Sequence, residues 1–333
     1  MARGVTSFKT RTGGLIQADG FIGSQILTQG KQFYVKPRTG SDGSSGRSPS
    51  QAVKTLAKAL SLATAKQNDT VFLFAEGHAA ADTTDYQSET LDWNKDLVHL
   101  IGVHAGGPVA QRARVALLST YATASNLFTL SGHGCLIQDV HFFAGVASAN
   151  PTGCMKVTGQ RNVFRNCHIA GIGNDANDIA GAYSVLLDGG AENLFDDCTI
   201  GLDTIARGTA ANSGLLVDTA ATRNEFRNCR FIAQLEHATN HVHVRLADAT
   251  AIDRYLLFRE CLFYYMSANY ATAGTGVMNL PLLTQGYVIV DRCMAFSDAH
   301  GTAIKWDVND RDRILLMHAP TPAADTAGVA RAV

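Results

Sequence analysis

The sequence carries a repeat of about 31 residues, and this repeat constrains the fold more than any other feature. Five cysteines follow one another at intervals of 31, 31, 32 and 32 residues, each inside the same six-residue phrase. The phrases are FRNCHI (164–169), FDDCTI (195–200), FRNCRF (226–231), FRECLF (258–263) and VDRCMA (290–295), and an earlier copy, IQDVHF (137–142), has Val140 in place of the cysteine. Between them lie short β-type runs and small polar stretches that leave no room for a helix of about ten residues. Such units cannot bury their apolar faces alone, so the repeat predicts a solenoid of stacked strands.

This pattern resembles the right-handed parallel β-helix of the pectate-lyase-like superfamily. The resemblance implies an all-β fold over residues 71–318, a right-handed parallel β-helix of about eight rungs with roughly 31 residues each. In such helices a stacked polar residue, often Asn, lies at a corner between two strands. The matching column here is Asp139, Asn166, Asp197, Asn228, Glu260 and Arg292.

Three further columns are expected to face the interior. One contains the apolar residues Ile137, Phe164, Phe195, Phe226, Phe258 and Val290, one the five cysteines, and one Phe142, Ile169, Ile200, Phe231 and Phe263. Rungs lie about 4.8 Å apart, so stacked Cβ atoms are too distant and too parallel for the disulfide spacing of about 3.8 Å. The sequence therefore predicts free, buried thiols that pack as small hydrophobes.

Residues 32–70 are predicted to cap the open end of the solenoid. Residues 33–63 resemble the strand, Gly-Ser-Asp loop and short amphipathic helix with which many β-helix proteins of phages and bacteria begin. Either Ser48 or Ser50 is expected as the helix N-cap, with Pro49 in the first turn. The face predicted to be buried contains Val53, Leu56, Ala57, Leu60 and Ala63.

The two ends of the chain lie outside the repeat. Residues 1–31 are predicted to form an arm that anchors the chain to a larger assembly through Arg3, Lys9 and Arg11, the alternative being a disordered or strand-adding arm. Residues 319–333 form a tail, either a flexible end or a docking peptide. The start has no apolar segment typical of a signal peptide, and the chain has no run of about 18 apolar residues, so no membrane span is expected. A net charge of −1 argues against a nucleic-acid partner.

No catalytic residue, cofactor or metal is predicted. The carboxylates to consider under an enzymatic alternative are Asp188, Asp218 and Asp248, spaced 30 and 30 residues apart, because glycoside hydrolysis uses a pair of carboxyl groups. The interpretation we favour is that each begins a turn and bonds its own backbone. His141 and His168 share an outward column, but Thr199 is its next member, so the column does not predict a series of histidine metal ligands. His241 and His243 are expected to be solvated or to lie between subunits, with metal binding as the alternative.

A second outward column mixes charges of both signs. It predicts surface ion pairs between neighbouring rungs rather than the Arg base and acidic Ca²⁺ site of a lyase. Its members are Gln138, Arg165, Asp196, Arg227, Arg259 and Asp291.

The segment 254–270 is apolar or aromatic at almost every position, so both faces of its strands carry apolar side chains. An exposed apolar patch marks an interface or a binding groove. We expect a subunit interface here, since parallel β-helices of phage origin are commonly side-by-side trimers. The predicted interface contains Tyr255, Leu257, Leu262, Tyr264 and Met266.

Two functions follow from the resemblance. The favoured one is a structural phage virion protein, a homotrimer that assembles in the host cytoplasm and decorates the capsid or projects from the particle. Short connections between strands and reduced cysteines favour this interpretation. The alternative is a tailspike-type polysaccharide depolymerase, a glycoside hydrolase or lyase, or a glycan-binding module that contacts a host surface glycan.

Overall fold

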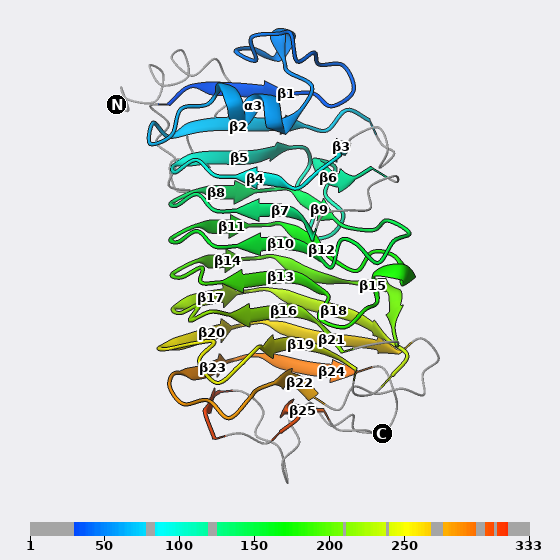
Figure 1. Ribbon diagram of the computed structural model, residues 1–333, viewed down its shortest axis with the longest axis vertical. Helices are drawn as coiled ribbons and strands as arrows, with labels where there is room; N and C mark the ends of the chain where they lie inside the picture. Colours follow the sequence, from blue (N-terminus) through cyan, green and yellow to red (C-terminus); the bar gives the residue numbers. More distant parts are fainter. Residues whose placement is uncertain are drawn as a thin grey trace, which may run out of the picture.

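The computed structural model describes residues 30–77, 84–118, 125–208, 211–237, 240–267, 276–297, 304–309 and 312–318. These residues form a right-handed parallel β-helix, as the repeat predicts, with three parallel sheets running along its length (Figure 1). The predicted anchor residues Arg3, Lys9 and Arg11 and the tail 319–333 lie outside the described residues. Within the described part of the chain, no helix is long and apolar enough to cross a membrane.

Each of eight rungs contributes one strand to each sheet, and sheet A has one further strand at either end, so strands that are stacked in space are separated by a rung in sequence. Sheet A consists of β1 (Gln32–Val35), β2 (Asp69–Phe74), β5 (Val98–Val103), β8 (Leu136–Gln138), β11 (Val163–Arg165), β14 (Leu194–Asp196), β17 (Asn224–Arg227), β20 (Tyr255–Arg259), β23 (Tyr287–Asp291) and β26 (Ile314–Met317). Sheet B consists of β3 (Thr84–Gln87), β6 (Arg114–Leu117), β9 (His141–Phe143), β12 (His168–Ala170), β15 (Thr199–Arg207), β18 (Arg230–Leu235), β21 (Leu262–Ser267) and β24 (Met294–Ser297). Sheet C consists of β4 (Leu91–Trp93), β7 (Asn126–Leu130), β10 (Gly153–Val157), β13 (Tyr183–Asp188), β16 (Asn212–Asp218), β19 (His241–Leu246), β22 (Gly276–Asn279) and β25 (Lys305–Asp307).

The interior is organised in the columns that the sequence predicts. The rings of Phe164, Phe195, Phe226 and Phe258 are stacked, with centroids 4.3, 4.6 and 5.2 Å apart along the column. All seven cysteines are free and buried, and several thiols donate weak hydrogen bonds to carbonyls of the preceding rung, such as Cys229 Sγ to Phe195 O at 3.4 Å. Cysteine fits this column because it is small and still supplies a donor.

The corner between sheets A and B is a two-residue turn in six consecutive rungs, from β8–β9 to β23–β24. The second residue is the buried cysteine, or Val140 in the first of these rungs. The first residue has a positive φ, between 46° and 57°, which Asn and Asp tolerate better than other non-glycine residues. This column is the predicted one, namely Asp139, Asn166, Asp197, Asn228, Glu260 and Arg292. Its members are exposed or half-buried, so their shared property is the turn conformation rather than a buried amide stack.

The buried amide ladder lies instead at the corner between sheets C and A, which corrects the prediction. Asn162, Asn193 and Asn224 are at most 1% exposed. The backbone N–H of Asn162 donates to Asn193 Oδ1 at 2.9 Å, and the backbone N–H of Asn193 donates to Asn224 Oδ1 at 2.9 Å. Their Nδ2 groups donate to the carbonyls of Gly132, Gly159 and Gly190, so the ladder satisfies buried backbone groups of two rungs at once.

A short helix, α3 (Leu56–Leu62), covers the first rungs beside β1 (Figure 1). Its buried residues Leu56, Ala59 and Leu60 belong to the same core cluster as the strands. The N-cap is Thr55, whose side chain accepts from the Lys58 backbone N–H, so the prediction of Ser48 or Ser50 is wrong. Those residues belong to a separate 3-10 turn, η2 (Pro49–Gln51), with Ser48 at its N-cap and Ser50 inside it. The later start of α3 leaves Ala57 exposed and buries Ala59.

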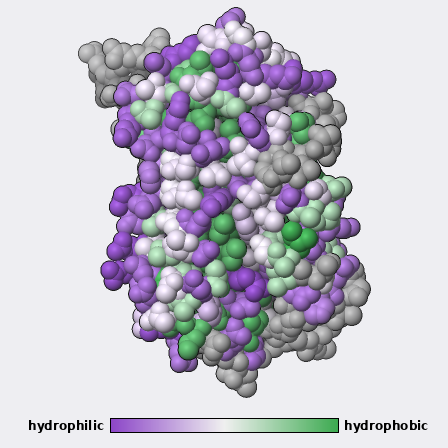
Figure 2. All heavy atoms as spheres, viewed as in Figure 1, coloured by the Kyte–Doolittle hydropathy of each residue, from purple (hydrophilic) through white to green (hydrophobic). Residues whose placement is uncertain are grey.

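The outer surface is mixed in polarity. On the face that Figure 2 shows, hydrophobic residues (green) form small separate patches between hydrophilic ones (purple), and no continuous apolar band runs along the described residues in that view. The interior columns therefore supply the continuous apolar core of the fold.

Replacing Phe195 by Ala should destabilise the protein by about 3–5 kcal/mol, because the ring is fully buried between two others and its removal leaves a cavity. Denaturant unfolding followed by circular dichroism measures the loss. Leu282→Ala is the control, since Leu282 is 72% exposed and should change stability by about 0.5 kcal/mol or less. Equal losses of stability in the two variants would show that the Phe195 ring is not packed in the core.

Replacing Asn193 by Ala should cost about 1–3 kcal/mol, because it leaves the Asn162 N–H and the Gly159 carbonyl without a partner in the interior. Gln234→Ala, at a half-buried position of β18, serves as the matched control in the same unfolding experiment. A stability loss no greater than that of the control would show that the amide ladder does not stabilise the fold.

The seven thiols should resist modification in the folded protein. Burial raises the pKa of Cys135 to about 11 and raises that of Cys154 further, and both side chains are at most 1% exposed. With a disulfide reagent at pH 8, we expect no rapid reaction in the native state and all seven thiols to react in guanidinium chloride. Rapid labelling of three or more native thiols would contradict the assignment of the inward cysteine column, because only Cys135 and Cys154 lie outside it.

Candidate functional site

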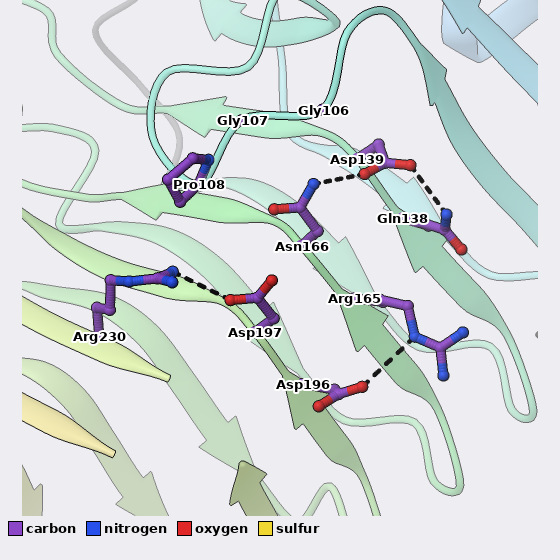
Figure 3. Close-up of a pocket in the computed structure, with 10 residues that line it drawn as sticks. All are labelled: Gly106, Gly107, Pro108, Gln138, Asp139, Arg165, Asn166, Asp196, Asp197 and Arg230. Atoms are coloured by element: carbon purple, nitrogen blue, oxygen red, sulfur yellow. Dashed lines mark hydrogen bonds and ion pairs between the residues drawn. The ribbon is translucent and has the colours of Figure 1, made fainter. Parts of the chain in front are cut away.

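The candidate site is an open groove of about 500 Å³ at the corner between sheets A and B, which we call the corner groove (Figure 3). It extends along β8, β11 and β14, and Arg230 of β18 lies at one side. Its lining residues are Gly106, Gly107, Pro108, Gln138, Asp139, Arg165, Asn166, Asp196, Asp197 and Arg230.

Two rows of side chains form the floor of the groove. Gln138, Arg165 and Asp196 end successive strands of sheet A and are register neighbours. The residue after each of them is the turn residue with positive φ, which sends a second polar side chain out of the same corner. The sequence periodicity therefore places six carboxylate, amide or guanidinium groups side by side, although successive members of each row are 27 and 31 residues apart along the chain.

The polar groups of the floor are paired with one another (Figure 3). Arg165 Nε lies 3.5 Å from Asp196 Oδ2, and Arg230 Nη1 lies 3.1 Å from Asp197 Oδ1. Asp139 accepts from Asn166 Nδ2 at 2.6 Å, and also from the side-chain amide of its neighbour Gln138 at 2.9 Å. The pairs neutralise most of the charge and hold the side chains in position.

The other wall is residues 104–113, which connect β5 to β6 and which we call the strap. Gly106, Gly107 and Pro108 of the strap line the groove, and a Cβ on Gly106 would lie 3.6 Å from the Asn166 amide. The strap is held by long-range bonds to sheet B and to the corner. One of them joins Thr199 Oγ1 to the Pro108 carbonyl at 2.8 Å, across 91 residues of sequence.

The groove offers an alternation of donors and acceptors. Guanidinium and amide groups donate, and carboxylates accept, which matches the hydroxyl groups of a sugar because each hydroxyl does both. Neither a histidine nor a cysteine is among the ten lining residues. Across the described ranges of the chain, no group of three or more His, Cys, Asp and Glu side chains is placed to hold a metal ion.

Ion pairs between neighbouring rungs occur as the mixed outward column predicts. Asp196 pairs with Arg165, and Arg259 Nε lies 3.0 Å from Asp291 Oδ2. Arg227 is different, because its guanidinium pairs with Glu225 of the same strand. Most of these side chains are partly exposed, so each pair contributes little to stability, about 0–1 kcal/mol.

The three carboxylates considered from the sequence lie away from the corner groove, at or after the ends of sheet C strands. Asp188 and Asp218 are register neighbours in β13 and β16. A hydrogen bond from Lys156, whose Nζ lies 2.6 Å away, lowers the pKa of Asp188. Asp218 Oδ1 accepts the Thr219 N–H, and Asp248 lies in the turn after β19, where it accepts the Thr250 N–H at 2.7 Å. The structure thus places two of them together and the third in a turn.

The histidines of β19 are buried rather than solvated, which corrects the expectation from the sequence. His241 is 3% exposed and its Nδ1 lies 2.6 Å from Asn212 Oδ1. The ring of His243 stacks on Tyr265 with centroids 3.9 Å apart. Burial lowers the pKa of both histidines, so they are neutral members of the packed interior of one chain.

The predicted interface residues occupy β20 and β21. Leu257 is only 8% exposed, whereas Tyr255, Leu262, Tyr264 and Met266 are half-buried. Strand alternation explains this, because Phe263 and Tyr265 take the inward positions of β21. The next rungs continue the outward columns with Met294 and Phe296, and the rings of Tyr264 and Phe296 lie 4.6 Å apart.

Sequence reasoning missed the strap and the grouping of the corner residues into one groove. The turn residues were visible as a column, but nothing in their spacing shows that a connection 30 or more residues earlier returns to lie against them. The amide ladder left a clearer signal, because Asn precedes the stacked Phe by two positions in NVFRNC, NLFDDC and NEFRNC.

Comparisons with known protein families and with curated proteins give no match. Among solved structures, the chain is similar in fold to the pectate lyase Pel9A, with a TM-score of 0.56 and 15% identity over 83% of this chain. It spans 65% of that lyase. It is also similar to a pectin methylesterase solved in complex with a hexasaccharide, with a TM-score of 0.51 and 15% identity over 90% of this chain and 93% of the other. At these identities the similarity shows the fold alone, and that fold is the parallel β-helix that these structures share.

Proposed function

We propose that the protein is a structural component of a phage virion, a trimeric β-helix that decorates or projects from the particle. The observation that carries this proposal is the apolar outer face of the last rungs. On sheet B, Leu262 and Tyr264 are register neighbours of Met294 and Phe296, and Met294 is 49% exposed. On sheet A, the last rungs also carry exposed apolar side chains, namely Tyr287, Leu315 and Met317 at 43–48%. A stack of exposed apolar residues favours side-by-side association of copies.

The chemistry of the outer surface agrees with a structural role. The carboxylates that sequence and geometry offer for sugar cleavage are engaged by Arg, Lys, amide or backbone donors within the chain. The capping segment β1–α3 supports the phage assignment through its resemblance to the start of phage β-helix proteins.

Light scattering on the full-length protein tests the association. For the wild-type protein we expect a mass of three times 35.5 kDa. The double variant Tyr264→Glu and Met294→Glu should be a monomer, because it would bury two charges in each subunit interface. Tyr86→Glu is the control, since Tyr86 is 45% exposed on β3, at the opposite end of the solenoid. A monomeric wild-type protein, or a double variant that stays trimeric, would contradict the proposed interface.

A second candidate function is glycan binding in the corner groove, favoured by its alternating donors and acceptors. Under this hypothesis Arg165→Ala and Asp196→Ala should weaken binding of host surface polysaccharide about tenfold or more, as each removes a charged hydrogen-bonding group. Arg254→Ala, at a 63% exposed side chain outside the groove, should leave binding unchanged. Calorimetry measures binding, and a reducing-end assay on the same mixtures should stay flat. New reducing ends or unsaturated products would instead favour the depolymerase alternative.

A further inference from the structure

The strap covers a column of polar side chains on the outer face of sheet B. Arg114, His141, His168, Thr199 and Arg230 are register neighbours on five successive strands. Outward-facing residues of a solenoid are normally wet, yet the middle three of these are at most 4% exposed. The bonds from the strap to this column and to the corner beside it account for the burial.

One of these bonds depends on the protonation state of a histidine. The backbone N–H of Ala110 in the strap donates to His168 Nδ1 at 3.1 Å, and His168 Nε2 donates to the Gly201 carbonyl at 2.9 Å. The imidazole therefore has to be neutral, with its proton on Nε2. A second proton would occupy Nδ1 and face the Ala110 N–H, and this would replace a hydrogen bond by a repulsion.

The remaining bonds of the strap are not broken by acid. Both ring nitrogens of His104 face carbonyls, Nδ1 that of Ala105 and Nε2 that of Asp139 at 2.7 Å, so a protonated His104 would keep its bond to the corner. Gln111 Nε2 donates to the Asn166 carbonyl at 2.8 Å, and Thr199 Oγ1 donates to the Pro108 carbonyl. His168 is thus the one titratable side chain of sheet B that accepts a backbone N–H of the strap among the described residues.

The surroundings of His168 oppose a positive charge. The His141 ring lies parallel to it at 4.5 Å, and neither nitrogen of His141 has a hydrogen-bond partner among the residues that the structure describes. Arg114 on β6 adds repulsion, Arg112 on the strap repels a charge on His141, and Asp203 on β15 gives the opposing attraction. Burial is the largest cause and lowers the pKa of His168 to about 4, and it lowers that of His141 well below its usual value.

We propose that the strap is an acid-released latch: protonation of His168 breaks its bond to Ala110, and residues 104–113 leave sheet B and open one wall of the corner groove. When the strap is released, His168 reaches water and titrates near 6.5. The latched state therefore has its full stability above pH 6.5 and loses it as the pH falls toward 4. In this range the ratio of latched to released strap falls by up to about tenfold per pH unit. This inference concerns the strap alone and stands whether or not the groove binds a glycan.

A spin label on the strap tests the release in the full-length protein. Val109 is 47% exposed, and the seven native cysteines are buried, so Val109→Cys provides one reactive thiol. We expect the nitroxide to be restricted at pH 7.5 and to become mobile between pH 6.5 and 4, while circular dichroism shows that the sheets remain folded. A label that stays restricted down to pH 4, or one that becomes mobile only as the sheets unfold, would overturn the proposal.

Two further variants, each combined with Val109→Cys, identify the group that is responsible. In His168→Gln the side-chain oxygen can accept the Ala110 N–H and the amide can donate to Gly201, but the group takes up no proton, so the label should stay restricted at pH 5. The same acid transition in this variant would show that His168 is not the latch. Gln111→Ala keeps His168 and removes a pH-independent bond, so its transition should move to higher pH. A transition at the same pH as in the parent Val109→Cys protein would show that the Gln111 bond does not hold the strap on sheet B.

Discussion

Parallel backbone pairing in register is the interaction on which the rest of this structure depends. Every described strand of the three sheets pairs with the strand one rung away, so each residue lies about 4.8 Å from its counterpart. Any property that recurs with the repeat then becomes a continuous column. The phenyl rings pack face to face, and five of the seven thiols share one interior row. The amides of Asn162, Asn193 and Asn224 form a ladder that satisfies backbone groups between rungs.

The same register organises the outer surface, with a different outcome on each face. At the corner between sheets A and B, the positive-φ turn directs two polar side chains outward per rung, and in three successive rungs these side chains form the floor of the corner groove. On the last rungs the outward positions of sheets A and B hold apolar side chains instead. One scaffold thus presents a polar groove near its middle and an apolar face near its C-terminal end. A connection such as the strap can cover part of an outward column and bury side chains that would otherwise be exposed to solvent.

Fold and function have to be separated for this scaffold. The pectate lyase and the pectin methylesterase share its architecture at 15% identity, which is a statement about backbone geometry. What the outer side chains do is decided locally. Asp188 is held by Lys156, and Asp196 and Asp197 are held by Arg165 and Arg230, so these charges are engaged within the chain. This arrangement is the physical basis for proposing a structural or binding role.

The sequence by itself determined the parts that repeat. The Cys-containing phrases predicted the β-helix, the inward Phe and Ile columns and the free thiols, because a constant period turns a local pattern into a stack. It misplaced the amide ladder, since both corners carry Asn and only backbone geometry separates the buried Asn193 from the turn residue Asn166. It also misplaced the cap of α3, because Ser48, Ser50 and Thr55 are all acceptable N-caps and the position of the helix against β1 and β2 decides between them. Only the tertiary structure brought the strap onto His168 and Thr199, since contacts across 58 and 91 residues have no period from which they can be read.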